Sequence, residues 1–105
     1  MNAVDKEVLL TEVRKAIGTV LDPEFGIPVD DLGLIYDLRI REGEVSIQMT
    51  LTTQHCPAGE VIVNGVKAAV ESLPSVRQAT VTLVWDPVWT PNMLSARARE
   101  LLGWG

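Results

Sequence analysis

Hydrophobic residues recur at spacings of three and four in two long segments, which predicts two amphipathic helices. The first runs from Asp5 to Leu21 and ends at Asp22-Pro23. The second has Pro57 at its first helical position and ends at Leu73-Pro74. A third, shorter helix is predicted from about Asn92 to Leu102. Segments with a different pattern separate all three, so no two helices follow each other directly in the chain.

Three further segments alternate apolar and polar residues, as half-buried strands do. Leu34–Arg41 and Glu44–Thr52 flank Glu42-Gly43, which predicts a β-hairpin, and Val76–Trp85 is a third strand. A helix links the second strand to the third, which favours right-handed parallel pairing. We therefore predict an α/β (α+β) fold with two layers, in which a mixed three-stranded sheet carries the helices on one face in the order α-β-β-α-β-α.

The size of the chain sets the number of domains. Its 105 residues are 47% hydrophobic, which is enough for one core and not for two. Residues 1–105 are therefore expected to form a single domain. A two-layer domain this thin leaves a sheet face or edge with little cover, so we also expect a homodimer.

Charge and cysteine content narrow the class of protein. Fourteen acidic side chains against nine basic ones give a formal net charge of −5, the wrong sign for binding nucleic acid or anionic lipid. No segment has the roughly 20 apolar residues that cross a bilayer. The first residues do not resemble a secretory signal, and a lone cysteine forms no intrachain disulfide. We expect a soluble cytoplasmic protein with a reduced thiol.

The segment TTQHCPAG, residues 52–59, holds the one cysteine of the chain, Cys56, and the one histidine, His55. It leaves a predicted strand and enters a predicted helix, so we place Cys56 at or beside the helix N-cap. The helix dipole there favours a thiolate, the form that binds metal or attacks an electrophile. Thr52 and Thr53 can donate hydrogen bonds to the sulfur or to its ligand. In the alternative interpretation, Cys56 is a small buried apolar residue.

Other candidate residues have simpler explanations. His55 is adjacent to Cys56 and so is a poor chelating partner, and a surface imidazole is its default role. Asp22 and Glu24 can act as hard metal ligands, although loop carboxylates more often cap turns or face solvent. Trp85 and Trp89 belong either to the core or a subunit contact, or to the wall of a pocket.

Three motifs resemble one known family. The segments DPEFGIPVDDLGLIYDL, MTLTTQHCPAG and LVWDPVWTPNMLSARARELLG are together similar to the SufT and PaaD group of metal-sulfur cluster assembly proteins. The resemblance implies a small α/β domain that assists maturation of iron–sulfur proteins without catalysis. It places the family's motif cysteine on Cys56, its threonines on Thr52 and Thr53, and its Asp-Pro-Glu on Asp22, Pro23 and Glu24. Gln54-His55 departs from the usual Pro-Gly, and no cysteine-rich C-terminal extension is present, which favours the stand-alone branch.

One thiol per chain cannot build a conventional cluster site, because iron–sulfur clusters are held by several thiolates. We therefore hypothesise a transient or shared site in which Cys56 contacts iron or an iron–sulfur cluster. The loops Asp22–Gly33 and Asp86–Asn92 would frame it, and the partners would be the assembly machinery and client apoproteins. Two alternatives remain: an interaction module that recruits clients without metal, and a cysteine-dependent enzyme, which would need a base within hydrogen-bond reach of the thiol.

Overall fold

The computed structural model describes residues 3–54 and 57–103 of the chain. Its elements follow in the order α1 (Ala3–Ile17), β1 (Ile35–Arg41), β2 (Glu44–Met49), α2 (Gly59–Glu71), β3 (Gln78–Leu83), the 3-10 turn η1 (Pro91–Met93) and α3 (Ala96–Leu102). This confirms the predicted α-β-β-α-β-α order and α+β class. No helix among the described residues combines the length and the apolar character needed to cross a bilayer.

The three strands form one mixed sheet in the order β1-β2-β3. β1 pairs with β2 antiparallel through the two-residue turn Glu42-Gly43, and β2 pairs with β3 parallel. Both turn residues have positive φ, 50° and 82°, as a type I′ hairpin turn requires. The predicted hairpin and the predicted parallel crossover are therefore both confirmed.

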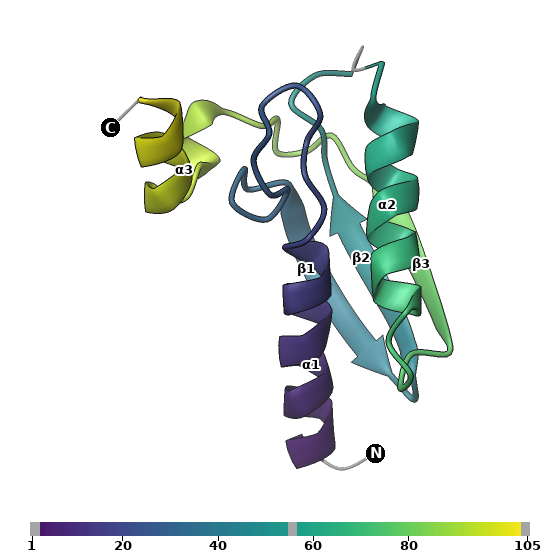
Figure 1. Ribbon diagram of the computed structural model, residues 1–105. Helices are drawn as coiled ribbons and strands as arrows, with labels where there is room; N and C mark the ends of the chain where they lie inside the picture. The colour runs from purple at the N-terminus through teal and green to yellow at the C-terminus, as the bar shows by residue number, and fades with distance from the viewer. Residues whose placement is uncertain (1–2, 55–56, 104–105) are drawn as a thin grey trace.

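The core lies between the sheet and two helices. Figure 1 shows α1 and α2 side by side over one face of the sheet, with α1 on the β1 side and α2 on the β3 side. Apolar residues spaced three and four apart on each helix face alternate positions of the strands. The buried members are Leu9, Val13 and Ile17 on α1, Ile62, Val66 and Val70 on α2, and Ile40, Val45, Ile47, Met49 and Ala79 on the strands.

The other face of the sheet is polar. Its side chains are those that alternate with the buried positions, namely Asp37, Arg39, Arg41, Glu44, Ser46, Gln48, Gln78, Thr80 and Thr82. This face can therefore stay in water without a helical layer, and it offers little apolar surface for a second copy to bury. The homodimer remains a prediction.

α1 is shorter than predicted. It ends at Ile17, because the next residues pair with a later part of the chain instead of continuing the helix. The Val29 N–H donates to the Val20 carbonyl at 2.9 Å, and the Asp22 N–H donates to the Ile27 carbonyl at 2.9 Å. Residues 18–34 thus form an ordered loop that closes on itself, and several of its apolar side chains enter the core.

α3 begins later than predicted and lies beyond the end of the sheet, beside the loop that follows α1 (Figure 1). Ser95 is its N-cap and accepts a hydrogen bond from the Ala98 N–H at 3.0 Å. The Ser95 hydroxyl also donates to Asp31 at 2.9 Å, and its N–H donates to the Asp31 carbonyl at 2.8 Å. Gly103 closes the helix with φ of 73°, as predicted. α3 is therefore attached to the 18–34 loop, while α1 and α2 alone cover the sheet.

Gly33 should be required where the 18–34 loop meets η1. Its φ is 79°, and an added Cβ would collide with the backbone oxygen of Met93 and lie 2.8 Å from the Met93 Cβ. We expect Gly33→Ala to lower the free energy of unfolding by at least about 2 kcal/mol, because both the strained φ and the backbone contact oppose the substitution. Chemical denaturation measures this.

Gly26 provides the matched control for that measurement. Its φ is also positive, 66°, but an added Cβ would meet nothing within 4 Å. Gly26→Ala should therefore cost only about 1 kcal/mol, the strain of the backbone conformation alone. Equal losses for the two variants would show that the contact between Gly33 and Met93 does not constrain the fold.

Candidate functional site

Parallel pairing of β2 and β3 brings two loops to the same edge of the sheet. Parallel strands end on the same side, so the loop after β2, residues 50–58, and the loop after β3, residues 84–90, emerge next to each other. The Val84 N–H still donates to the Met49 carbonyl at 2.8 Å, so the pairing continues to the point where both loops begin. The first of these loops carries Cys56.

A pocket of about 320 Å³ lies between the two loops. The loop after β2 contributes Leu51, Thr52, Thr53 and Gln54, and the loop after β3 contributes Trp85, Val88 and Trp89. The pocket therefore combines aromatic walls with hydroxyl and amide groups next to the chain position of the thiol. Trp85 and Trp89 line this pocket and also pack against the core, so both interpretations of these residues hold. The role of Thr52 and Thr53 toward Cys56 stays a prediction.

Hydrogen bonds from two other segments hold the loop after β3 in place. The Trp89 indole N–H donates to the Leu32 carbonyl at 2.6 Å, which ties one wall of the pocket to the 18–34 loop. The Tyr36 hydroxyl donates to the Pro87 carbonyl at 2.8 Å and contacts the Met93 sulfur at 3.4 Å. These bonds connect the loop after β3 to the 18–34 loop and to β1. That residues 22–33 and 86–92 frame a site around Cys56 stays a prediction.

Tyr36 is a residue that the sequence analysis missed. The register of β1 against β2 shifts between Ile35 and Asp37, and Tyr36 lies within this irregularity. Such a bulge turns a side chain away from its regular position, here toward the loop after β3. Nothing in the strand pattern of Ile35–Arg41 indicates this, because a bulge depends on the pairing partner as well as on the strand itself.

The Tyr36 hydroxyl is electrostatically unfavourable to ionise. Burial raises the pKa of Tyr36, the neighbouring Thr50 hydroxyl opposes that shift, and the Asp86 carboxylate adds to it. Tyr36 therefore stays protonated at neutral pH and acts as a hydrogen-bond donor. Among the described residues, the fully buried Thr50 Oγ1 has no partner with the geometry of a hydrogen bond.

Asp22 holds a turn. It is 2% exposed, and its Oδ1 accepts hydrogen bonds from the N–H groups of Glu24 at 2.8 Å and Phe25 at 3.3 Å. Neither Asp22 nor the exposed Glu24 lines the pocket. Their framing role stays a prediction, and the contact between this loop and the pocket wall runs through the Leu32 carbonyl.

His55 and Cys56 lie outside the described residues, so their predicted roles stay predictions. The predicted start of the following helix is wrong, however: Ala58 is the N-cap of α2 and Gly59 is its first residue. Gly59 lies close to the end of the preceding strand, since an added Cβ would be 2.8 Å from the Leu51 Cδ1. Cys56 precedes the N-cap by two positions, which weakens the argument from the helix dipole, because that field falls off within the first turn.

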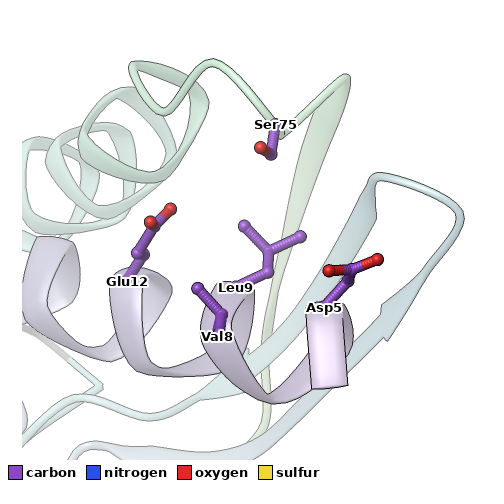
Figure 2. A pocket seen from close by; sticks show the side chains of 5 residues that line it. All are labelled: Asp5, Val8, Leu9, Glu12 and Ser75. Carbon is purple, nitrogen blue, oxygen red and sulfur yellow. The ribbon is translucent and has the colours of Figure 1, made fainter. Parts of the chain in front are cut away.

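A second hollow, of about 350 Å³, lies at the opposite end of the sheet. Figure 2 shows Leu9 pointing toward Ser75, with the carboxylates of Asp5 and Glu12 on either side and Val8 nearby. Its lining has carboxylates but no thiol or imidazole. Among the described residues, moreover, no group of three or more His, Cys, Asp and Glu side chains is placed to hold a metal ion. The pocket lined by residues 51–54 is the better candidate site because it adjoins the chain segment that carries Cys56.

Comparison with known proteins identifies the family of the chain. Residues 10–83 match the family model described as iron-sulfur cluster assembly protein. The Fe-S protein maturation auxiliary factor YitW of Bacillus subtilis is 40% identical over 99 residues, covering 93% of this chain and 97% of that protein. The Fe-S protein maturation auxiliary factor SufT of Staphylococcus aureus is 40% identical over 85 residues, covering 80% and 97%.

Solved structures share the fold over almost the whole chain. A Bacillus anthracis domain of unknown function, DUF59, superposes with a TM-score of 0.89 at 33% identity and covers 97% of this chain and 98% of its own. A conserved hypothetical protein of Thermotoga maritima gives a TM-score of 0.78 at 36% identity, covering 89% and 92%. With the family model and these relatives in agreement, the chain belongs to the family of iron–sulfur cluster assembly proteins.

Proposed function

We propose that the protein is an iron–sulfur maturation factor whose Cys56 contacts iron or a cluster in transit to a client. The observation that carries the proposal is the pocket between two loops, with Thr52 and Thr53 on the loop that contains Cys56 and two tryptophans on the loop after β3. Family membership supports the role in assembly or maturation. The iron or cluster is cargo here and not a resident cofactor.

The amino-acid content of the site supports a transient contact. Clusters are usually held by several thiolates, and this chain supplies one. The remaining ligands would come from a second copy, from the assembly machinery or from the client apoprotein. A site that is complete only in a complex binds its cargo weakly when alone, which suits a factor that must hand the cargo on.

A non-catalytic role is part of the proposal. A thiol enzyme needs a base within hydrogen-bond reach of its nucleophile. Tyr36, which adjoins the pocket through Pro87, has a raised pKa and is therefore a poor base at neutral pH. The B. subtilis and S. aureus relatives are named auxiliary factors, which fits the same role. We place the protein in the cytoplasm, as the lone reduced thiol leads us to expect.

One observation favours a second candidate, an interaction module that recruits clients without touching metal. Val88 is 74% exposed at the rim of the pocket, beside Trp85 and Trp89. Exposed apolar and aromatic groups of this kind often anchor protein contacts. A variant without the thiol and a variant with an altered pocket rim distinguish the two candidate functions, because only the first variant lacks a metal ligand.

Cys56→Ser should abolish client maturation while the protein folds normally. The substitution removes the thiolate but changes the side-chain volume little, so the free energy of unfolding should change by less than about 1 kcal/mol. The activity of an iron–sulfur enzyme in cells that carry the variant, together with denaturation of the same purified variant, measures both quantities. Retained maturation would remove the thiol from the mechanism and leave the interaction module.

Val88→Asp should impair client maturation several-fold at nearly unchanged stability. Because the side chain is exposed, the free energy of unfolding should stay within about 0.5 kcal/mol of the wild type. The matched control is Leu101→Asp on α3, where an apolar side chain is 63% exposed but lies outside the pocket lining. The same client assay reads both variants, and equal effects would argue against a client contact at the rim.

A further inference from the structure

A groove of about 380 Å³ runs between α1 and the outer edge of β1. Its apolar lining comes from Leu10, Leu38 and Ile40, and its charged lining comes from Lys6, Arg39 and Arg41. No carboxylate lines it, although the chain as a whole has a formal net charge of −5. The groove is therefore an apolar channel with a cationic rim on an acidic protein.

Backbone groups of β1 face this groove. In a hairpin closed by two residues, the flanking residues Arg41 and Glu44 form a hydrogen-bonded pair, and such pairs alternate along the strand. Leu38 and Ile40 occupy the alternate positions, so their N–H and C=O groups point away from β2. Within the described part of the chain, these groups have no hydrogen bond outside the strand ladder. The outer edge of β1 is thus free to pair with another strand.

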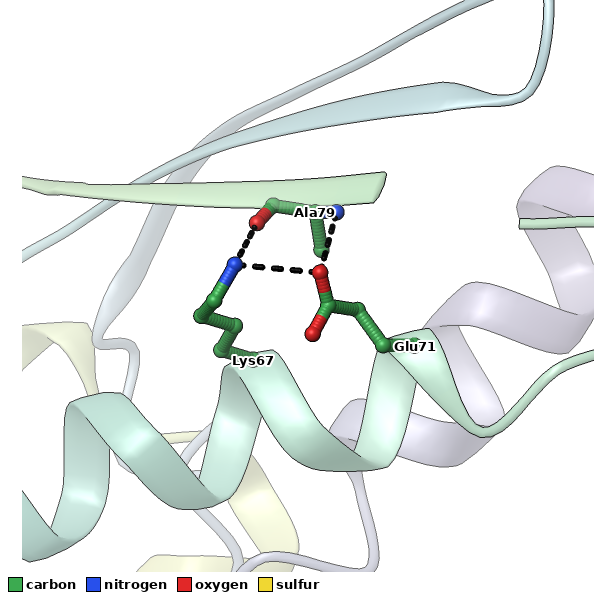
Figure 3. A network of polar contacts seen from close by, with 3 residues as sticks. All are labelled: Lys67, Glu71 and Ala79. Atoms are coloured by element: carbon green, nitrogen blue, oxygen red, sulfur yellow. Dashed lines mark hydrogen bonds and ion pairs between the residues drawn. The ribbon is translucent and has the colours of Figure 1, made fainter. Parts of the chain in front are cut away.

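The opposite edge of the sheet is protected. Figure 3 shows that Lys67 and Glu71 of α2 reach over β3 and occupy both backbone groups of Ala79. Lys67 Nζ donates to the Ala79 carbonyl at 2.6 Å, and the Ala79 N–H donates to the Glu71 carboxylate at 3.1 Å. The Ala79 N–H and the Lys67 ammonium lower the pKa of Glu71, which keeps it charged in this role. At this point of β3, hydrogen bonds to side chains thus replace those that a neighbouring strand would make.

The charges beside β1 select the kind of strand that can bind. Arg39 is engaged by Asp37 at 2.9 Å, while Lys6 and Arg41 form no ion pair within the described part of the chain. A second copy would bring Arg39 and Arg41 as well as Asp37 to this edge, so it would neutralise these cations less completely than an acidic strand would. Because side chains alternate along a strand, an acidic strand would place its apolar side chains over the groove, on the face of Leu38 and Ile40. Its carboxylates would lie on the open face beside Arg39 and Arg41.

We propose that the outer edge of β1 binds an extended acidic segment of a partner protein by strand addition. The partner's backbone would pair with Leu38 and Ile40, and its alternating side chains would divide between the apolar channel and the cationic rim. The groove lies toward the hairpin turn, at the end of the sheet away from residues 50–58 (Figure 1). A partner held there does not cover the pocket lined by residues 51–54, and its binding does not depend on cluster transfer.

The test uses an acetylated hexapeptide of alternating glutamate and valine as the probe. On titration into the wild-type protein, amide NMR signals of Leu38, Ile40 and Lys6 should shift, and the affinity should fall as salt is added. A peptide with lysine in place of glutamate should not bind. A peptide with proline in place of the central valine should bind much more weakly, because proline removes one backbone donor.

Two variants with the same charge change provide the control. Arg41→Glu reverses the cation beside the partner's carboxylates and should weaken binding about threefold to fivefold, the range for one exposed charge contact. Lys15→Glu changes an exposed cation outside the groove and should leave binding unchanged. Equal losses for both variants, shifts confined to β3 or to residues 50–54, or equal binding of the proline peptide would overturn the proposal.

Discussion

Parallel pairing of β2 with β3 is the constraint on which the candidate site depends. Helix α2 must cross between the two strands, so the loop that leads into it begins at the same edge where the loop after β3 begins. The tryptophans then reach the threonines of the other loop. The 18–34 loop fixes this arrangement through the bond from Trp89 to Leu32. A site assembled from three loops is thereby held on a rigid sheet.

Much of the fold could be predicted because the hydrophobic pattern reports which face of each element is buried. The hairpin at Glu42-Gly43 and the helical spacing of apolar residues in α2 are local features, and both were predicted correctly. The ends of helices that depend on contacts with other parts of the chain were not predicted correctly. Val20 and Leu21 continue the apolar pattern of α1 but pair with residues 28–29. Likewise, α2 starts beside Leu51 and not at the preceding proline.

The site was predictable only where residue type and loop position coincide. Thr52, Thr53 and the two tryptophans have conspicuous chemistry at strand ends, and they meet in one pocket. Tyr36 was missed because its direction comes from a bulge that arises only when β1 pairs with β2. Asp22 was predicted to frame the site, and that role stays a prediction; what the structure adds is that its carboxylate accepts hydrogen bonds from the turn that follows it. Sequence shows that a carboxylate is present, whereas the fold determines what it contacts.

The central claim is that Cys56 contacts iron or a cluster, and spectroscopy tests it most directly. Wild type and Cys56→Ala would be reconstituted anaerobically with ferrous iron and sulfide and compared by absorption and Mössbauer spectra. We expect thiolate-ligated iron in the wild type, bound in less than one cluster per chain, and its loss in Cys56→Ala. Identical spectra for the two proteins, or no protein-bound iron in the wild type, would contradict the claim.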